Sequence, residues 1–130
     1  MQVEIPALLR FECCIPNAPW GEDHWATVHA FTRGQAKSEY WRDIRECWSE
    51  IPYTAVRCRG PFTPCDTEKF RHTANYRKVD YHIGDPVMWR GKVGRIVDSN
   101  SSANFEVLFP DGARIHIHPI DVAQGAVTLG

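Results

Sequence analysis

Two segments near the start of the chain have the hydrophobic pattern of strands. Residues 8–15 are apolar except for Arg10 and Glu12, and residues 25–31 are rich in aromatic and β-branched residues that alternate between two faces. One face of this second segment carries Trp25, Thr27, His29 and Phe31. Such alternation is typical of strands, and the turn-forming residues 16–23 between the two segments favour a hairpin.

A helical period begins at residue 32. Thr32 and Gln35 have the spacing of a capping box, in which both side chains satisfy free N–H groups at the start of a helix. Apolar residues then recur at helical spacing, namely Ala36, Tyr40, Ile44, Cys47 and Trp48. Pro52 ends this helix because proline cannot continue the hydrogen-bond ladder. Residues 54–59 read as a further strand, so residues 1–60 are predicted to form a ββαβ unit.

The next segment, residues 61–80, contains two prolines and scattered charges of both signs. We expect a partly packed connector there, with one helical turn near residues 66–74. From residue 81 onward, short apolar strands alternate with turn residues about every ten residues, which predicts a small β-barrel over residues 81–130. The expected fold class is α+β, with the two parts packed together.

Composition and charge narrow the classes of function. The chain has 130 residues, 43% of them hydrophobic and 24% charged, which is ordinary for a folded domain. Fifteen Lys and Arg oppose sixteen Asp and Glu, giving a net charge of -1. No overall positive field would draw the protein to phosphate backbones, so a nucleic-acid site must be a local patch.

The start of the chain and the cysteine count indicate a reducing compartment. Residues 1–6 lack the basic start and apolar run of a signal peptide, and no segment approaches the roughly 20 apolar residues needed to cross a bilayer. The five cysteines are an odd number and include the adjacent Cys13 and Cys14. Reduced thiols in the cytoplasm fit this pattern better than a disulfide framework, and no membrane partner is expected.

No motif indicates catalysis or a cofactor. The cysteines lack a nucleophile signature, and the chain has no phosphate-cradling glycine loop, H-E-x-x-H or paired-carboxylate motif. Cys58, Cys65 and His72 are ligand types that zinc selects, but their spacing is not a finger pattern, and a buried strand position is favoured for Cys58. We therefore expect a protein that is not an enzyme and holds no cofactor.

A second set of metal ligand types lies near the end of the chain. His116 and His118 are two residues apart in a predicted strand, so their rings would project from the same face. Asp121 and His82 are candidates to join them. A half-exposed strand face is the favoured reading of this pair.

Residues 80–123 resemble the KOW and Tudor-like group of SH3-like barrels. The resemblance rests on Gly84-Asp85, on Gly91-Lys92-x-Gly94 as a first hairpin, and on Phe105-x-Val107-x-Phe109 followed by Asp111-Gly112. It implies an SH3-like barrel. Barrels of this type bind RNA, DNA, peptides or other protein domains.

A wider resemblance spans most of the chain. It rests on residues 32–37, residues 56–59, residues 100–109 and His118-Pro119, which look like small uncharacterised proteins of tailed phages and prophages. The resemblance implies a phage-type accessory protein in the host cytoplasm that binds a host protein stoichiometrically. An inhibitor of a bacterial antiviral defence system, of the anti-CRISPR type, is the favoured function.

Two alternatives stay open. A KOW-like nucleic-acid-binding protein is the second hypothesis, and a virion or assembly component is the third. For a nucleic acid, the barrel offers a stacking surface and cations, namely Trp89, Arg90, Lys92, Arg95 and Arg114, although nearby acidic residues offset their charge.

Large aromatic residues are frequent for so short a chain. Five tryptophans are present, and tryptophan, tyrosine and arginine dominate the energetics of protein interfaces. Trp20 in its Pro/Gly loop, and Trp41 off the main helical stripe, are expected near the surface. Either could anchor a host protein or a second copy of the chain.

Overall fold

The structure is a computed structural model that describes residues 5–19 and 24–124. The chain divides into two compact units. The N-terminal unit is Leu9–Thr63, and the C-terminal unit runs from Pro64 onward and includes the described residues before Leu9. Each unit combines one α-helix with an antiparallel sheet, so the predicted α+β class is confirmed.

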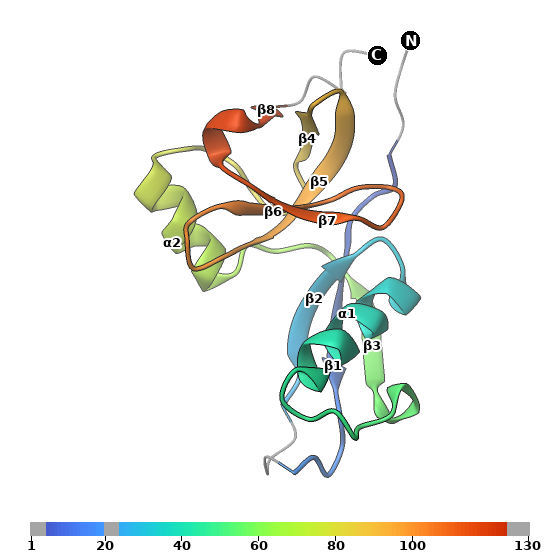
Figure 1. The fold of residues 1–130 in the computed structure, drawn as a ribbon. Helices are drawn as coiled ribbons and strands as arrows, with labels where there is room; N and C mark the ends of the chain where they lie inside the picture. The colour runs from blue at the N-terminus through green and yellow to red at the C-terminus, as the bar shows by residue number, and fades with distance from the viewer. Residues whose placement is uncertain (1–4, 20–23, 125–130) are drawn as a thin grey trace. The chain divides into compact units, whose positions relative to one another are not determined.

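The N-terminal unit is a three-stranded sheet with a helix on one face (Figure 1). Its elements are β1 (Leu9–Cys14), β2 (Ala26–Ala30), α1 (Arg33–Arg45), the 3-10 helix η1 (Tyr53–Ala55) and β3 (Arg57–Phe62). The strand order is β2-β1-β3, and both pairings are antiparallel. The core of the unit lies between the sheet and α1, where Phe11, Cys13, Ala36 and Tyr40 are buried.

The start of α1 is as the capping pattern predicted. The Thr32 hydroxyl accepts a hydrogen bond from the Gln35 N–H at 3.1 Å, and the Gln35 side chain accepts from the Phe31 N–H at 2.9 Å. The end of the helix differs from the prediction, because α1 stops at Arg45 and residues up to Pro52 form turns. Ile44 and Trp48 still pack on the core, whereas Cys47 is exposed.

A β-bulge between β1 and β3 sets which side chains share a face. Glu12 pairs with Arg59, but Arg10 pairs with Phe62, so the two-residue step on β1 matches three residues on β3. Gly60 lies in the bulge with φ of 118°, and a Cβ there would approach the Arg10 carbonyl oxygen to 3.0 Å. Arg33 donates hydrogen bonds to the carbonyl oxygens on either side of Arg59.

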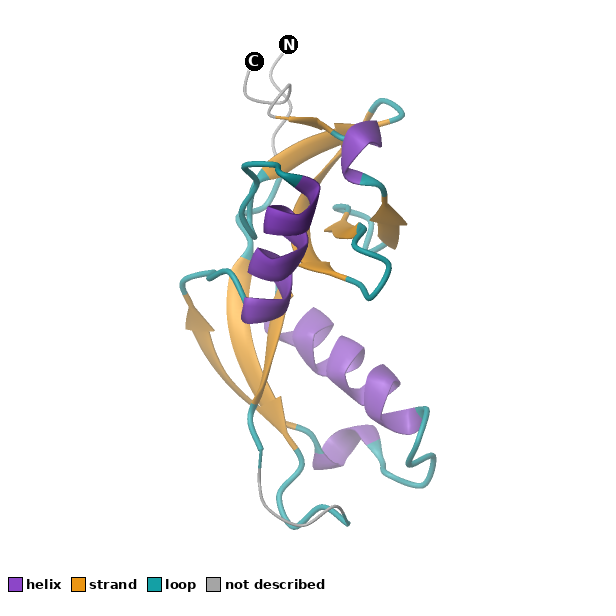
Figure 2. Ribbon diagram, turned by 90° about the vertical axis from the view of Figure 1, so that its left-hand side faces the viewer, coloured by secondary structure: helices purple, strands orange, loops and turns teal. Residues whose placement is uncertain are grey.

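The C-terminal unit is a five-stranded antiparallel sheet beside one helix (Figure 2). Its elements are α2 (Glu68–Arg77), β4 (Pro86–Trp89), β5 (Lys92–Ser99), β6 (Phe105–Leu108), β7 (Arg114–Ile117), the 3-10 helix η2 (Pro119–Asp121) and β8 (Ala123–Gln124). The strand order is β7-β6-β5-β4-β8. Within residues 5–19 and 24–124, β7 and β8 do not pair, so the sheet does not close into a barrel. The strand pattern had predicted a small β-barrel, and that prediction is wrong for the described residues.

Helix α2 occupies much of the predicted connector and is longer than the single turn expected. Thr67 caps its start by accepting from the Phe70 N–H at 3.1 Å, and Lys78 ends it in the left-handed conformation. Phe70, Thr73 and Ala74 form its buried stripe. The stripe has only two apolar residues, which is why the hydrophobic pattern underestimated the helix.

Aromatic rings join α2 to the sheet of its unit. The rings of Phe70 and Phe105 stack with centroids 5.3 Å apart, and Tyr81 meets Phe105 edge-on at the same distance. The Thr73 hydroxyl reaches Ser99 at 3.1 Å, so both buried polar side chains are satisfied. These contacts fix α2 along β5.

Neither helix in the described ranges has the length and apolar character needed to cross a membrane.

Candidate binding surfaces

Two of the arginines predicted to bind a partner serve the C-terminal unit internally. Arg95 donates to the carbonyl oxygens of Pro6 at 2.7 Å and Gly84 at 2.8 Å, and its burial lowers the pKa of its guanidinium. Arg114 donates to Glu106 at 2.9 Å with only 13% of its side chain exposed. Both guanidinium groups therefore hold segments of the fold together.

The remaining predicted residues of this unit lie together at the β4–β5 hairpin. Arg90 and Gly91 both have positive φ, which is the two-residue turn that matches the twist of paired strands. The Arg90 guanidinium lies 4.6 Å from the centroid of the Trp89 ring, and Arg90 and Lys92 are exposed. Of the five residues predicted to form a binding surface in this unit, only Trp89, Arg90 and Lys92 therefore lie together at the hairpin.

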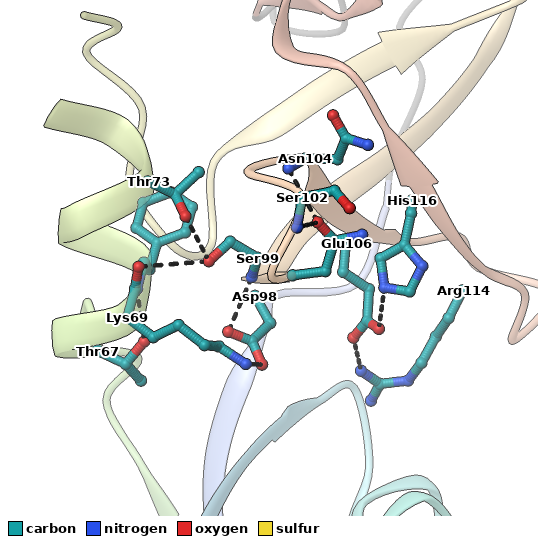
Figure 3. A network of polar contacts seen from close by, with 12 residues as sticks. Thr67, Lys69, Thr73, Asp98, Ser99, Ser102, Asn104, Glu106, Arg114 and His116 are labelled. Carbon is teal, nitrogen blue, oxygen red and sulfur yellow. Dashed lines mark hydrogen bonds and ion pairs between the residues drawn. The ribbon is translucent and has the colours of Figure 1, made fainter. Parts of the chain in front are cut away.

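An open groove of about 920 Å³ runs between α2 and the β5–β6 loop. Arg77 donates across it to the carbonyl oxygens of Ala103 at 2.9 Å and Ser102 at 3.2 Å. Asn100 Oδ1 accepts from the backbone N–H groups of Ser102 and Asn104, which sets the loop (Figure 3). The Arg77 and Asn100 side chains are therefore bonded to the β5–β6 loop itself, whereas Tyr76 is 69% exposed.

Next to this groove, polar contacts involve residues of β5, β6 and β7 (Figure 3). Lys69 reaches Asp98 at 3.1 Å, and Glu106 contacts Arg114 with one oxygen and His116 with the other, the latter at 3.1 Å. His118 lies beyond the end of β7, where its Nδ1 accepts from the Ile120 N–H and caps η2. The two histidines therefore have separate structural partners and do not share the predicted strand face.

The zinc candidates occupy different kinds of position. Cys58 is a half-buried residue of β3 and pairs with Cys13, Cys65 is exposed, and His72 is exposed on α2. Among the residues that the structure describes, no group of three or more His, Cys, Asp or Glu is arranged to hold a metal ion. Burial, followed by the neighbouring Cys58, raises the pKa of Cys13 to about 12, so this thiol stays protonated and is a poor nucleophile.

His82 forms an ion pair with Asp66 at 2.8 Å. The hydrogen bond that the His82 imidazole donates to Asp66, aided by the charge of that carboxylate, raises the pKa of His82. Burial alone would raise the pKa of Asp66, but hydrogen bonds from His82 and the Ile83 N–H, with the Arg71 charge, lower it overall. The pair fastens the segment before α2 to the segment before β4.

Of the two predicted tryptophan anchors, Trp20 lies outside the described residues. Trp41 is half-buried, and its indole N–H donates to the Ile51 carbonyl oxygen at 2.9 Å. Its ring meets Tyr53 edge-on with centroids 5.7 Å apart, and Arg45 lies over it at 4.5 Å. An open hollow of about 430 Å³ is lined by these three residues and by Ser38, Arg42 and Glu46. We call it the Trp41 hollow.

The sheet of the N-terminal unit carries a surface that the sequence reading missed. Arg59 bonds Glu12 at 2.7 Å and extends over the Trp25 ring at 4.1 Å. On the same side, Arg10 lies 4.8 Å from the Phe62 ring centroid. The bulge places Phe62 on this face, and no local sequence pattern signals such a shift.

Comparison with protein-family models, with curated proteins and with solved structures finds no match for this chain.

Proposed function

We propose that this chain is a phage-type accessory protein that acts without catalysis, by stoichiometric binding to a host protein, and that it inhibits a bacterial antiviral defence system. The target class comes from the sequence resemblance. The observation that carries the binding proposal is the Trp41 hollow, because Trp41, Tyr53 and Arg45 are the three residue types that most often dominate interface energies.

The geometry of the hollow suits an anchor for a protein partner. The hydrogen bond from Trp41 to the Ile51 carbonyl fixes the indole, so little side-chain freedom is lost on binding. Arg45 lies over the Trp41 ring, and Lys37 lies over the Tyr53 ring at 5.0 Å from its centroid, so each ring has a cation beside it. A partner that offers an acidic or carbonyl group beside an apolar side chain would meet both features.

We also propose that the sheet of the C-terminal unit is a KOW/Tudor-like relative of the SH3 barrel. Strands β4 to β7 follow one another as neighbours, and β8 returns to pair with β4 after η2. Such a return is the step by which a meander wraps around its own core. On this proposal, the unit is a scaffold that presents the β4–β5 hairpin with Trp89 and Arg90.

A matched pair of charge reversals tests the site. Arg45 and Arg90 are both exposed and each covers a tryptophan ring, one in each unit. The tagged full-length chain and its Arg45→Glu and Arg90→Glu variants would each capture partners from a bacterial lysate, with and without nuclease. We expect one nuclease-resistant host protein whose affinity for the Arg45→Glu variant falls about tenfold or more, with Arg90→Glu unchanged.

Other results would contradict parts of this proposal. Loss of the partner in Arg90→Glu alone would move the site to the hairpin. Recovery only of nucleic acid, or only of partners that disappear with nuclease, would exclude the host-protein reading and favour the nucleic-acid alternative. Circular dichroism of each variant establishes that the fold is intact, and Trp41→Phe, which keeps a ring but loses the N–H, should weaken capture less than Arg45→Glu.

A further inference from the structure

One face of the N-terminal sheet combines arginines with aromatic rings, and we call it the arginine–aromatic face. Its members are Arg10, Glu12, Trp25, Arg57, Arg59 and Phe62. It is the side of the sheet opposite to α1, the helix that covers the other side in Figure 2. Phe11, Cys13 and Val28 instead pack in the core between the sheet and that helix.

Strand register explains why these side chains share a face. Directly paired residues project to the same side of a sheet, so Glu12 lies beside Arg59, and Arg10 beside Phe62. The bulge adds one residue between Arg59 and Phe62 and turns Phe62 to the side of the arginines. Without it, the phenyl ring would point toward α1.

The exposed part of the face is positively charged. Three arginines oppose the single Glu12, although the whole chain has a net charge of -1. Half of the Arg59 side chain is exposed, and Arg57 and Phe62 are exposed residues. The same side also carries two buried residues, Cys14 beside Arg57 and His29 beside Arg10, so the exposed part of the face is formed by the longer side chains around them.

We propose that the arginine–aromatic face binds single-stranded nucleic acid. Phosphates would contact Arg10, Arg57 and Arg59, and bases would stack at Trp25 and Phe62. Each of these rings is covered by a guanidinium group, and a guanidinium plane is itself a surface on which bases stack. Glu12 orients two of the arginines by accepting from Arg59 at 2.7 Å and lying 3.8 Å from Arg10.

A single strand of nucleic acid supplies both kinds of group that this face can bind. Its backbone offers a phosphate to each of the three arginines, and its unpaired bases offer planar groups to the two rings. Duplex DNA fits less well, because its paired and stacked bases cannot reach the rings. This proposal does not depend on the Trp41 hollow, which is lined by other residues.

Fluorescence anisotropy with labelled oligonucleotides of mixed sequence tests the proposal on the full chain. Single-stranded DNA, the same sequence as RNA, and the DNA duplex are compared between about 50 mM and 200 mM salt. We expect single strands to bind in the micromolar range with affinity that falls as salt rises, and the duplex to bind more weakly. The DNA and RNA arms show which single strand is preferred.

Variants assign the binding to this face. Trp25→Ala should weaken binding about fivefold or more through lost stacking. Arg57→Ala should weaken it and lower the salt slope by about 0.7, the value for one phosphate contact on a single strand. Arg59→Lys keeps the charge but loses the planar group, so the salt slope should persist while affinity falls.

The control is Arg90→Ala, which removes an arginine over a tryptophan ring in the C-terminal unit. It should bind single strands as the unmodified chain does. Equal losses in Arg90→Ala and Arg57→Ala, loss in Arg90→Ala alone, or a preference for duplex would each overturn the proposal. So would the absence of any anisotropy change at low salt. Because Arg45→Glu lies outside this face, loss of the host protein in that variant would leave nucleic-acid binding intact.

Discussion

The two units use their cations and aromatic rings in different ways. In the C-terminal unit, Arg77, Arg95 and Arg114 donate to carbonyl or carboxylate oxygens of their own unit. In the N-terminal unit, Arg10, Arg45 and Arg59 lie over aromatic rings, and Arg10 and Arg59 do so while also donating to Thr63 and Glu12. Arg77 and Arg90 of the C-terminal unit lie over rings as well, but Arg95 and Arg114 serve the fold through oxygen acceptors. The first use joins segments of the chain, whereas the second leaves charge and ring together at the surface.

The aromatic rings follow the same division. Phe70, Phe105 and Tyr81 form a contiguous cluster in the C-terminal unit, with both phenylalanines fully buried. Trp25 and Phe62 lie on a sheet face instead, under guanidinium groups. An arginine close to an aromatic residue in the sequence therefore does not by itself indicate a binding site, because the fold decides which use is made of it.

Truncation of one ring in each unit gives the largest expected effect. Phe70→Ala should lower the free energy of unfolding by about 3–5 kcal/mol, because it leaves a cavity beside Phe105. Trp25→Ala should cost about 1 kcal/mol, since its ring lies on a sheet face. Guanidinium titration followed by circular dichroism measures the free energy of unfolding of both variants. Equal losses would contradict the difference between the two units. Phe70→Leu, which fills part of the cavity, should fall between the two.

Arginine truncation should produce a smaller difference. Arg77→Ala removes two hydrogen bonds to the β5–β6 loop, so about 1–2 kcal/mol should be lost from the free energy of unfolding. Arg59→Ala should cost less than about 1 kcal/mol, because its ion pair with Glu12 is half exposed. Thermal denaturation of the two variants measures these losses. A larger loss in Arg59→Ala than in Arg77→Ala would contradict the proposed difference between the units.

The smallest effect concerns the pH dependence of the C-terminal unit. Asp66 raises the pKa of His82, so the protonated imidazole stabilises the folded state. This contribution is fully present below the ordinary histidine pKa of about 6.5 and is lost as pH rises through the higher folded value. Asp66→Asn should lower the His82 pKa toward about 6.5 in an NMR titration. Asp80→Asn is the control, because Asp80 is 98% exposed and farther away, at 3.4 Å.

Local patterns predicted the elements whose signals lie within a few residues. Thr32 and Gln35 form the cap that their spacing indicated, and Ala36 and Tyr40 are the buried stripe of α1. The alternation in residues 8–15 and 25–31 gave β1 and β2, paired as a hairpin. Backbone capping and side-chain period depend on near neighbours, so they can be predicted before the fold is known.

Elements stabilised by distant residues were predicted less well. Helix α2 has a weak apolar stripe, and its burial depends on Phe105 and Ser99, both more than twenty residues away. Among the site candidates, Arg95 and Arg114 were predicted to bind a partner only because arginine is a common residue in binding surfaces. Their acceptors, Pro6 and Glu106, are distant or lie on a neighbouring strand, and they convert both arginines into structural residues.

The α+β class, the start of α1 and most strands could be predicted from the amino-acid sequence, because hydrophobic period and capping depend on residues a few positions apart. Which charged and aromatic residues share a surface depends on contacts between distant segments and became visible in the fold. The bulge at Gly60 turns Phe62 to the side of Arg10 and Arg59, and the Ile51 carbonyl fixes Trp41 in its hollow. Strand register and long-range hydrogen bonds each depend on two segments of the chain, so neither can be predicted from the sequence of one segment alone.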